Sequence, residues 1–222
     1  MVDGAFLKAA YGGTLISACT YNGLEKILPL AFAVVDSENN DSYEWFFQCF
    51  REAFGYREGM CIISDRNGSI AYGAEKVYPE AGHYFCIYHL LNNMKMKFKN
   101  HEHLKKIFFG AAKAYTNKQF KQKMRELDQM DVRIGLYLKD VGYEKWAAIH
   151  AKEYRRQAMT SNIAESLNSR NNKARELPVV ALLEALRSLC QEWSHNLRTI
   201  ALHTVTKLTQ KYHKILLMRM IE

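Results

Sequence analysis

The stretch Met60-Cys61-Ile62-Ile63-Ser64-Asp65-Arg66-Asn67-Gly68 decides the fold of this chain. Its apolar part is too short for a helix, and residues with turn chemistry follow directly, so we predict a short buried strand that ends on Asp65. Open α/β sheets bind their ligands at the carboxyl ends of strands, which makes Asp65 a candidate ligand. The alternative is that Asp65 only caps a helix beginning near Ser69. Acids elsewhere in the chain that reach Asp65 would decide between the two.

Composition narrows the class of protein. The chain has 222 residues, 48% of them hydrophobic, and three prolines, which indicates a globular protein. No apolar run approaches the length of a membrane span, and the first residues lack the signal-peptide pattern. The five cysteines are scattered and contain no Cys-x-x-Cys, which favours a reducing compartment over a disulfide framework. The net charge of +8 favours an anionic partner, with nucleic acid the first candidate.

The residues before Met60 predict three strands and a helix. Residues 1–7, 14–20 and 27–35 have strand patterns, with a hairpin signal at Asn22-Gly23 and a proline, Pro29, that suits an edge or a bulge. The residues from Asp41 to Glu44 resemble a capping box that opens an amphipathic helix. Burial in the core explains the aromatic face of this helix better than a base-stacking surface does: Tyr43, Phe46, Phe47, Phe50 and Phe54.

A helix over residues 69–77 and a strand over residues 83–87 complete the pattern of a mixed α/β sheet. From Leu90 to about Tyr154 no strand pattern remains, and helices fit residues 103–114, 117–127 and 143–154. We therefore expect a helical insertion over residues 91–156 that interrupts a core formed by residues 1–90 and 157–222.

The last part of the chain is predicted to be helical. A helix that begins at Thr160-Ser161-Asn162 contains Glu165, and Pro178 separates it from a helix over residues 179–193 whose apolar stripe is core material. Residues 201–220 predict a tail helix that packs on the core or on a further segment.

A basic run lies within the expected insertion. Between Lys95 and Glu126 ten Lys or Arg stand against two Glu: Lys95, Lys97, Lys99, Lys105, Lys106, Lys113, Lys118, Lys121, Lys123 and Arg125. A solvated helix face is the ordinary explanation for such a run, and a groove that contacts phosphates is the functional one.

Three acids lie at the ends of predicted elements: Asp3, Asp65 and Glu165. Each alone has a simpler explanation, since Asp3 can precede a turn at Gly4 and Asn162 to Glu165 has the spacing of a capping box. Together they suggest a carboxylate cluster for two divalent cations. Mg²⁺ prefers hard oxygen ligands and is typically held by a few carboxylates, and two ions about 3.5–4 Å apart serve phosphoryl transfer. Such acids repel one another without metal, so the cluster should bind metal readily but loosely.

Five stretches of the sequence together point to a known family: Asp3–Lys8 with Tyr11-Gly12-Gly13, Ala31–Glu38, Ile63-Ser64-Asp65-Arg66, Cys86-Ile87-Tyr88-His89 and Thr160–Asn168. In their order and spacing they resemble the Mutator-like element (MULE) transposases of plants, and the resemblance covers nearly the whole chain.

The resemblance implies an RNase H-like catalytic domain with a helical insertion, and an Asp-Asp-Glu triad carried over to Asp3, Asp65 and Glu165. Family members cut DNA at element ends and join the freed 3′-hydroxyl to target DNA with Mg²⁺ or Mn²⁺, so these three residues are the expected catalytic and metal-binding residues. The basic residues that we expect to approach DNA phosphates are Arg66, Lys105, Lys106, Lys113, Arg170, Lys173 and Arg175.

The Cys-x-x-His element, here Cys86 and His89, is a signature of the family beside the catalytic core. Two such ligands cannot close a tetrahedral zinc site by themselves. We therefore favour packing or hydrogen bonding over zinc, and the nearest further ligands would be His83, His101 and His103.

Several departures from the family bear on activity. Ala5 replaces the usual small polar residue, and Asn67 stands where a histidine commonly follows Ser-Asp-Arg. The start at Met1-Val2-Asp3 suggests a strand whose first half is missing, so we expect a fragment or a truncated gene product with reduced stability. The N-terminal DNA-binding region and C-terminal zinc-binding module of full-length relatives are also absent from this sequence.

The leading interpretation is therefore a nuclear DDE-type transposase domain that cleaves and transfers DNA strands. A domesticated or inactive relative that binds DNA and regulates transcription without cleavage is the alternative, and a plain RNase H-type nuclease is a third. The expected partner is DNA, with homo-oligomerisation as a further option, and we expect neither a membrane nor a small-molecule substrate.

Overall fold

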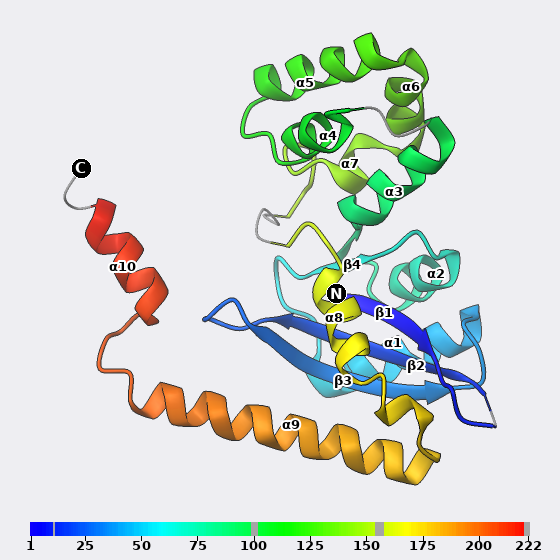
Figure 1. Cartoon of the computed structure of the whole chain (residues 1–222), viewed down its shortest axis with the longest axis vertical. Coiled ribbons are helices and arrows are strands. Elements are labelled where there is room, and N and C mark those ends of the chain that lie inside the picture. Colours follow the sequence, from blue (N-terminus) through cyan, green and yellow to red (C-terminus); the bar gives the residue numbers. More distant parts are fainter. Residues whose placement is uncertain (11, 99–101, 154–157, 220–222) are drawn as a thin grey trace.

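The computed structural model describes residues 1–10, 12–98, 102–153 and 158–219. Within them, the chain is a mixed α/β protein in which strands and flanking helices form one part and a separate group of helices stands above it (Figure 1). Several residues singled out above lie outside the described residues: Tyr11, Lys99, His101, Tyr154 and Met220.

The first three strands form an antiparallel sheet in chain order. β1 (Val2–Phe6) pairs with β2 (Thr14–Tyr21), which pairs with β3 (Ile27–Val35). The β2–β3 register shifts at Ala18/Cys19, opposite Pro29, so the predicted bulge is confirmed. β4 (Cys61–Ser64) pairs in parallel with β5 (Gly82–Phe85) and lies next to β1. Among the described residues the expected mixed sheet thus consists of two neighbouring ladders.

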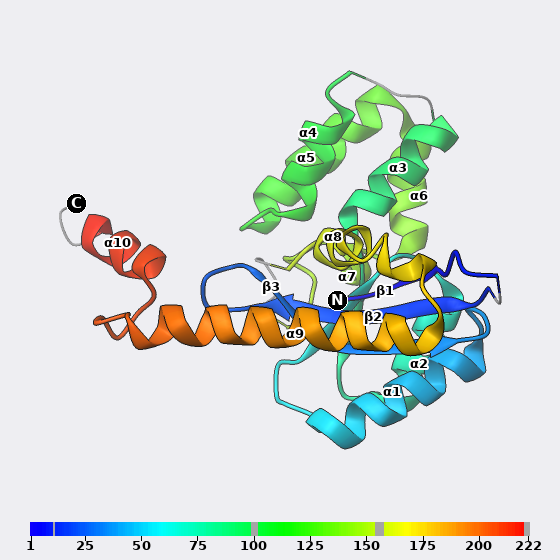
Figure 2. The same ribbon diagram turned by 60° about the horizontal axis from the view of Figure 1, so that its bottom comes forward.

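β2 is covered by helices on both faces, and its alternating side chains divide the core in two. Ile16 and Ala18 face α1 (Asn40–Phe54) and α2 (Gly68–Val77), whereas Leu15 and Cys19 face α8 (Asn162–Arg170) and α9 (Val179–Leu202). Figure 2 shows α1 and α9 on opposite sides of the strands. This burial on both faces explains the unbroken apolar run of β2.

The aromatic face of α1 is core in part: Tyr43, Phe46 and Phe47 are buried against the sheet and Phe50 is partly buried, but Phe54 is 43% exposed, contrary to the prediction. The predicted capping box at Asp41 is wrong, because Asn39 is the N-cap and accepts a hydrogen bond from the Ser42 N–H.

The start of β1 is held although a cavity lies beside it. The Met1 amine donates to the Cys19 carbonyl (2.8 Å) and the Cys19 N–H donates to the Met1 carbonyl (2.9 Å), so the ladder runs to the first residue. A cavity of about 710 Å³ opens where β1 begins, lined in part by Met1 and by residues from Met60 to Ile63. β1 is therefore fixed by β2 and is incompletely packed toward β4.

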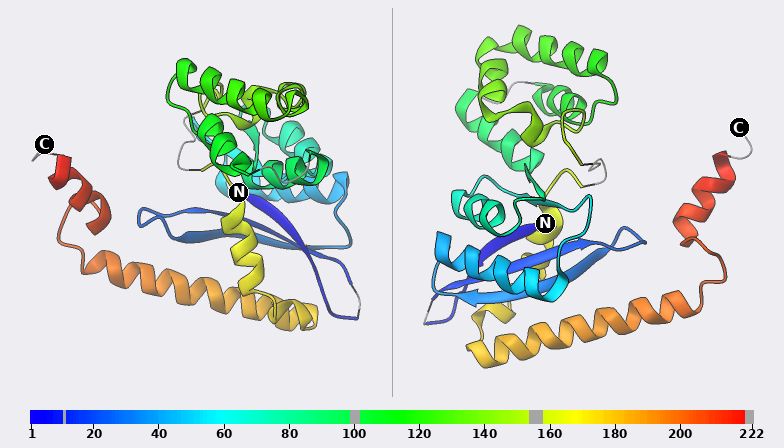
Figure 3. Two further views of the ribbon diagram at one scale, coloured as in Figure 1. Left: turned by 45° about the horizontal axis from the view of Figure 1, so that its top comes forward. Right: turned by 180° about the vertical axis from the view of Figure 1, so that it is seen from behind.

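The helical block comprises α3 (Ile87–Phe98), α4 (Leu104–Ala112), α5 (Asn117–Met130), α6 (Val132–Val141) and α7 (Tyr143–Trp146). Its own core runs from Ile87 to Met159 and centres on the fully buried Trp146, which packs on Phe108 and Phe120. Figure 3 shows the block as a separate layer above the strands from two further sides.

Two predicted boundaries in this region are wrong. The strand expected over residues 83–87 ends at Phe85, because Leu90 N–H bonds to the Cys86 carbonyl and opens α3. The helix expected over residues 143–154 stops at Trp146, because the Ala148 N–H turns away to the Ala112 carbonyl. Both breaks are set by contacts distant in sequence.

The C-terminal helices also differ from expectation. After the short 3₁₀ turn η1 (Ala174–Glu176), α9 continues past the predicted end at residue 193 to Leu202, and α10 (Gln210–Arg219) begins later than expected. Thr204 and Thr206 lie between them and bond their hydroxyls to nearby backbone carbonyls, which competes with a continuous helix. The predicted core stripe of α9 holds only in part, since Leu182 and Leu186 are buried but Leu183 is 49% exposed.

Two further findings concern the chain as described. All five cysteines are free, as the sequence predicted. Among the described helices, none has the length and apolarity that crossing a membrane requires.

Candidate metal and catalytic site

Asp3 lies within β1 and not before a turn, because Gly4 continues the strand opposite Ile16. Its Oδ2 accepts a hydrogen bond from the side-chain amide of Asn168 on α8 (2.8 Å). The side-chain carbonyl oxygen of Asn168 accepts a hydrogen bond from the Ser17 hydroxyl of β2 (2.8 Å). The buried Asn168 therefore ties α8 to the strand that holds Asp3.

Asp65 follows the last residue of β4, as predicted. The alternative that it caps the next helix is wrong, since Asn67 is the N-cap of α2 and accepts from the Ser69 N–H (2.8 Å). One Asp65 oxygen, Oδ1, accepts the Asn67 N–H (3.0 Å), and no hydrogen bond to its other oxygen is found within the described residues. The carboxylate is half-buried at the carboxyl edge of the sheet, where a ligand can reach it.

Glu165 lies in the first turn of α8, and the predicted capping box is again wrong. Ser161, not Asn162, is the N-cap. The Ser161 hydroxyl donates to Glu165 Oε1 (3.4 Å), and His89 Nε2 lies 3.6 Å from the same oxygen. Glu165 is therefore turned toward α3, the first helix of the helical block.

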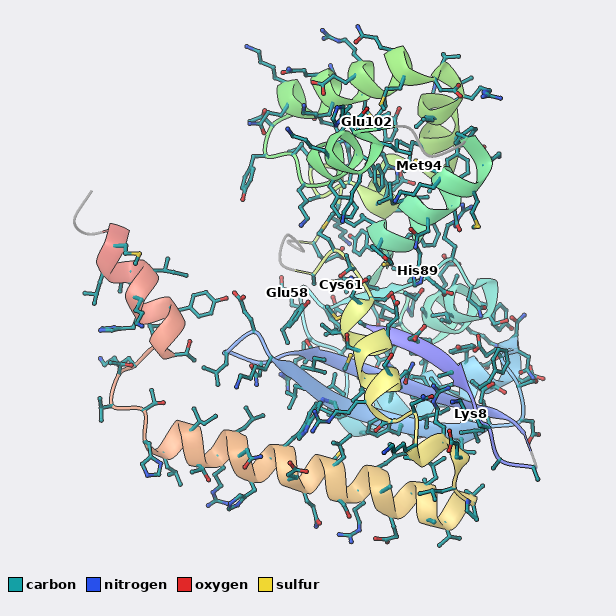
Figure 4. The ribbon with its side chains drawn as sticks, viewed as in Figure 1. Lys8, Glu58, Cys61, His89, Met94 and Glu102 are labelled. Atoms are coloured by element: carbon teal, nitrogen blue, oxygen red, sulfur yellow. The ribbon has the colours of Figure 1, made fainter. Side chains whose placement is uncertain are left out.

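Cys86 and His89 support the start of α8. The Ser161 N–H donates to Cys86 Sγ (3.2 Å), and the Ser161 hydroxyl lies 3.4 Å from His89 Nδ1. Figure 4 shows His89 where the helical block meets α8 and the strands. The Cys-x-x-His element thus fixes the helix that presents Glu165.

The electrostatics indicate that the three acids share one site. Burial raises the pKa of Asp3 to about 6, the Asn168 hydrogen bond opposes the rise, and the charges of Asp65 and Glu165 add to it. This mutual influence requires the three carboxylates to lie near one another. The fold therefore brings together residues that are 62 and 100 positions apart in the sequence (65 − 3 and 165 − 65).

Cys86 and His89 form a polar pair beside this site. The hydrogen bond to Cys86 raises the pKa of His89 to about 9 against the effect of burial, helped by the charges of Cys86, Glu165 and Asp65. Burial acts to raise the pKa of Cys86, yet hydrogen bonds from His89 and Ser161 lower it. The pair therefore presents positive charge on the imidazole to Glu165.

Carboxylate oxygens suit a hard divalent cation, but within the described residues the three acids do not form a group whose ligand atoms all lie within 4.8 Å of one another. The group that does is Cys86, His89 and Glu165, at the Cys-x-x-His element. The expected further histidines are not part of it, because His83 bonds to the Ser64 hydroxyl (2.9 Å) and His103 is exposed beside Glu102. Three ligands leave a tetrahedral zinc site incomplete.

Three residues near the acids had no role assigned from the sequence. Glu38, in the segment between β3 and α1, accepts a hydrogen bond from the Asn67 side chain (2.7 Å), and Tyr43 and Asn168 complete the surroundings. Glu38 and Asn168 both lie in stretches that resemble the family, which was the available signal.

The basic residues expected to meet phosphates have varied surroundings. The Arg66 guanidinium lies 5.7 Å from the Phe85 and Tyr137 rings, and Arg175 donates to the Phe6 carbonyl (2.7 Å). Arg170 lies 5.2 Å from the Trp193 ring. The others are exposed residues in the helical block or after α8: Lys105, Lys106, Lys113 and Lys173.

Comparison with known proteins agrees with this geometry. Residues 1–93 match the family model described as the MULE transposase domain, and no curated protein matches the chain. The matched range includes Asp3, Asp65 and the Cys86–His89 element but ends before Glu165, whose position beside them comes from the structure. The first 93 residues of this chain are therefore similar to the MULE transposase domain.

Proposed function

We propose that this chain is the catalytic domain of a DDE-type DNA transposase with an RNase H-like fold, acting in the nucleus. Its three acids, Asp3, Asp65 and Glu165, would bind two Mg²⁺ or Mn²⁺ ions and serve strand cleavage and transfer. The fold assignment is supported by three antiparallel strands joined to a parallel pair, with helices on both faces and a helical insertion before α8.

The observation that supports the proposal best is the convergence of three acids from distant elements at one edge of the strands. Burial is the main cause of the raised pKa of Asp3, and the charges of Asp65 and Glu165 add to it, so these carboxylates oppose one another without a cation. An arrangement that destabilises the metal-free protein is expected where a cation is to be bound. The similarity of residues 1–93 to the MULE transposase domain makes DNA the expected substrate.

Different residues of the chain would orient the three acids. Asn168 orients Asp3, the Asn67 N–H orients Asp65, and Ser161 with Cys86 holds the start of α8. When bound, divalent cations would activate the attacking oxygen and stabilise the leaving one. The exposed basic residues after α8 and in the helical block are candidates for phosphate contacts, with Lys173 the one nearest to α8 in sequence.

The experiment is metal-dependent nicking of plasmid DNA by the wild type and Asp65→Ala, with exposed Asp36→Ala as the matched control. We expect nicking in Mn²⁺ or Mg²⁺ by the wild type and the control, and a loss of at least 100-fold in Asp65→Ala. Equal nicking by wild type and Asp65→Ala would contradict the assignment.

A titration with Mn²⁺ alone separates catalysis from the non-cleaving alternative. Binding by the wild type that disappears in Glu165→Gln supports a competent site. A folded wild type that binds no Mn²⁺ would favour a relative that contacts DNA without cleaving it.

A further inference from the structure

Glu38 is a fourth acid that reaches this site from the other side of the sheet. It lies in the bend between β3 and α1, and its Oε2 accepts a hydrogen bond from the side-chain amide of Asn67 (2.7 Å). The backbone N–H of the same Asn67 donates to Asp65 Oδ1 (3.0 Å). One residue therefore holds both carboxylates, which brings Glu38 next to Asp65.

The contacts of Glu38 with β1 are close. A methyl group at Gly4 would lie 2.3 Å from Glu38 Oε1 and 2.8 Å from the Tyr43 hydroxyl oxygen. Glycine at this position, directly after Asp3, is what allows the Glu38 carboxylate to lie against the strand. The side chain is therefore fixed in place and not extended into solvent.

The Tyr43 hydroxyl links Glu38 to the other acids. Tyr43 is fully buried, its hydroxyl lies beside Glu38, and it interacts with the Glu38 carboxylate as a hydrogen-bond donor. Burial raises its pKa, followed by the charges of Glu38, Asp3 and Asp65. A buried hydroxyl that lies beside Glu38 and feels the charges of Asp3 and Asp65 places Glu38 in the surroundings of the same acids.

Glu38 has no basic ion-pair partner in the part of the chain that the structure describes. Among residues 1–10, 12–98, 102–153 and 158–219, no Lys, Arg or His forms an ion pair with Glu38. Burial raises the pKa of Glu38, and the charge of Asp65 raises it further, while hydrogen bonds from Tyr43 and Asn67 oppose the rise. A glutamate with a purely structural role would be expected to have a positive partner or to face solvent.

We propose that Glu38 is a ligand of the divalent cation bound by Asp65, so that the site contains four carboxylates and not three. This inference rests on the proposed function, because it assumes that the acids bind metal. It adds a residue from the β3–α1 segment to a site otherwise formed by β1, the end of β4 and α8.

The test is isothermal titration of Mn²⁺ into four proteins: the wild type, Glu38→Gln, Gly4→Ala and Glu52→Gln. Glu52 is an exposed glutamate on α1, so its substitution removes the same charge away from the site. Gly4→Ala keeps the Glu38 charge but displaces its carboxylate from the strand. Thermal melts without metal check that each variant is folded.

We expect Glu38→Gln to weaken Mn²⁺ binding by about 10-fold or more and Gly4→Ala to weaken it several-fold, with Glu52→Gln within twofold of the wild type. Glu38→Gln should also raise the Tm of the metal-free protein, since it removes a carboxylate beside Asp65. Unchanged Mn²⁺ affinity and stoichiometry in Glu38→Gln, in a protein whose binding needs Asp65, would overturn the role of Glu38 alone. A folded wild type that binds no Mn²⁺ would overturn both this inference and the proposed function.

Discussion

The acids on the strand side of the site and the acid on α8 compensate their negative charge in different ways. Asp3 and Asp65 accept hydrogen bonds from neutral donors, the Asn168 side chain and the Asn67 backbone. Glu165 instead faces the imidazole of His89, whose pKa is raised to about 9 by Cys86. The acids on the strand side are therefore oriented by neutral donors, and among the described residues His89 acts on them through its charge without forming an ion pair, whereas Glu165 lies 3.6 Å from the His89 ring.

This difference has a consequence for how a cation enters. A divalent ion should bind first beside Asp3 and Asp65, because the positive charge of His89 lies within ion-pair distance of Glu165 and not of these two acids. Glu165 would join by turning from His89, a movement of one side chain on a helix that Ser161 and Cys86 hold fixed. The two sides can be tested separately, because each has its own supporting residue.

Removing Asn168, which supports Asp3 on the strand side, should have the largest effect on the free energy of unfolding. Asn168→Ala deletes the donor to the half-buried Asp3 carboxylate and the acceptor of the buried Ser17 hydroxyl, which we expect to lower the free energy of unfolding by about 3 kcal/mol. Urea unfolding of the metal-free protein measures it, with exposed Asn162→Ala on the same helix as control. Equal losses in the two variants would contradict an orienting role for Asn168.

Neutralising Asp3 should stabilise the metal-free protein. Because the folded pKa of Asp3 is about 6 and its ordinary value is 3.8, the free energy of unfolding falls as pH rises between these values. Asp3→Asn should remove this dependence and gain about 2 kcal/mol at pH 7 after solvent screening.

Urea unfolding between pH 4 and pH 7 checks the Asp3 prediction, and exposed Asp36→Asn is the charge-matched control. Wild type and Asp3→Asn with parallel pH profiles would show that Asp3 is not crowded by other acids. In Mn²⁺ the wild type should become more stable than Asp3→Asn, because only the wild type retains the Asp3 carboxylate that would bind the cation.

Removing His89, beside Glu165 on the α8 side, should have the smallest effect on the free energy of unfolding. The pKa of His89 is raised from 6.5 to about 9, so its stabilising contribution is complete below about pH 6.5 and is lost as pH rises through about 9. His89→Gln should cost about 1 kcal/mol or less at pH 7, since the pair with Glu165 is partly exposed. Unfolding at pH 6 and pH 9.5 measures the difference.

His89→Gln also tests whether His89 and the cation compete for Glu165. If His89 competes with the cation for Glu165, the variant should bind Mn²⁺ about as well as the wild type or a few-fold more tightly. A loss of 10-fold or more would mean that His89 positions Glu165 for the metal, and the two sides would no longer be independent.

The strand framework could be predicted from local patterns alone. The strand over residues 27–35 has the predicted bounds, and Asp65 follows a buried strand as its short apolar run indicated. These elements are set by alternation and by turn residues close in sequence. Predicted helix boundaries were wrong where a hydrogen bond to a residue distant in sequence ends the element, as at Ala148, whose N–H donates to the Ala112 carbonyl.

The surroundings of the acids were beyond the reach of local patterns. Glu38 stands in a turn-like segment, and its partner Asn67 is 29 positions away, so no periodicity marks it. The capping explanations for Asp65 and Glu165 failed because Asn67 and Ser161 already occupy the N-cap positions. A residue type that suits a cap and a ligand equally well can be assigned only when its neighbours in space are known.

The most direct test of the metal site is the position of Mn²⁺ in crystals soaked with MnCl₂. The account predicts anomalous difference peaks about 2.1 Å from carboxylate oxygens of Asp3 and Asp65, with Glu38 and Glu165 turned toward them. A peak confined to Cys86 and His89, or no peak beside Asp3 and Asp65 in a well-ordered crystal, would contradict it.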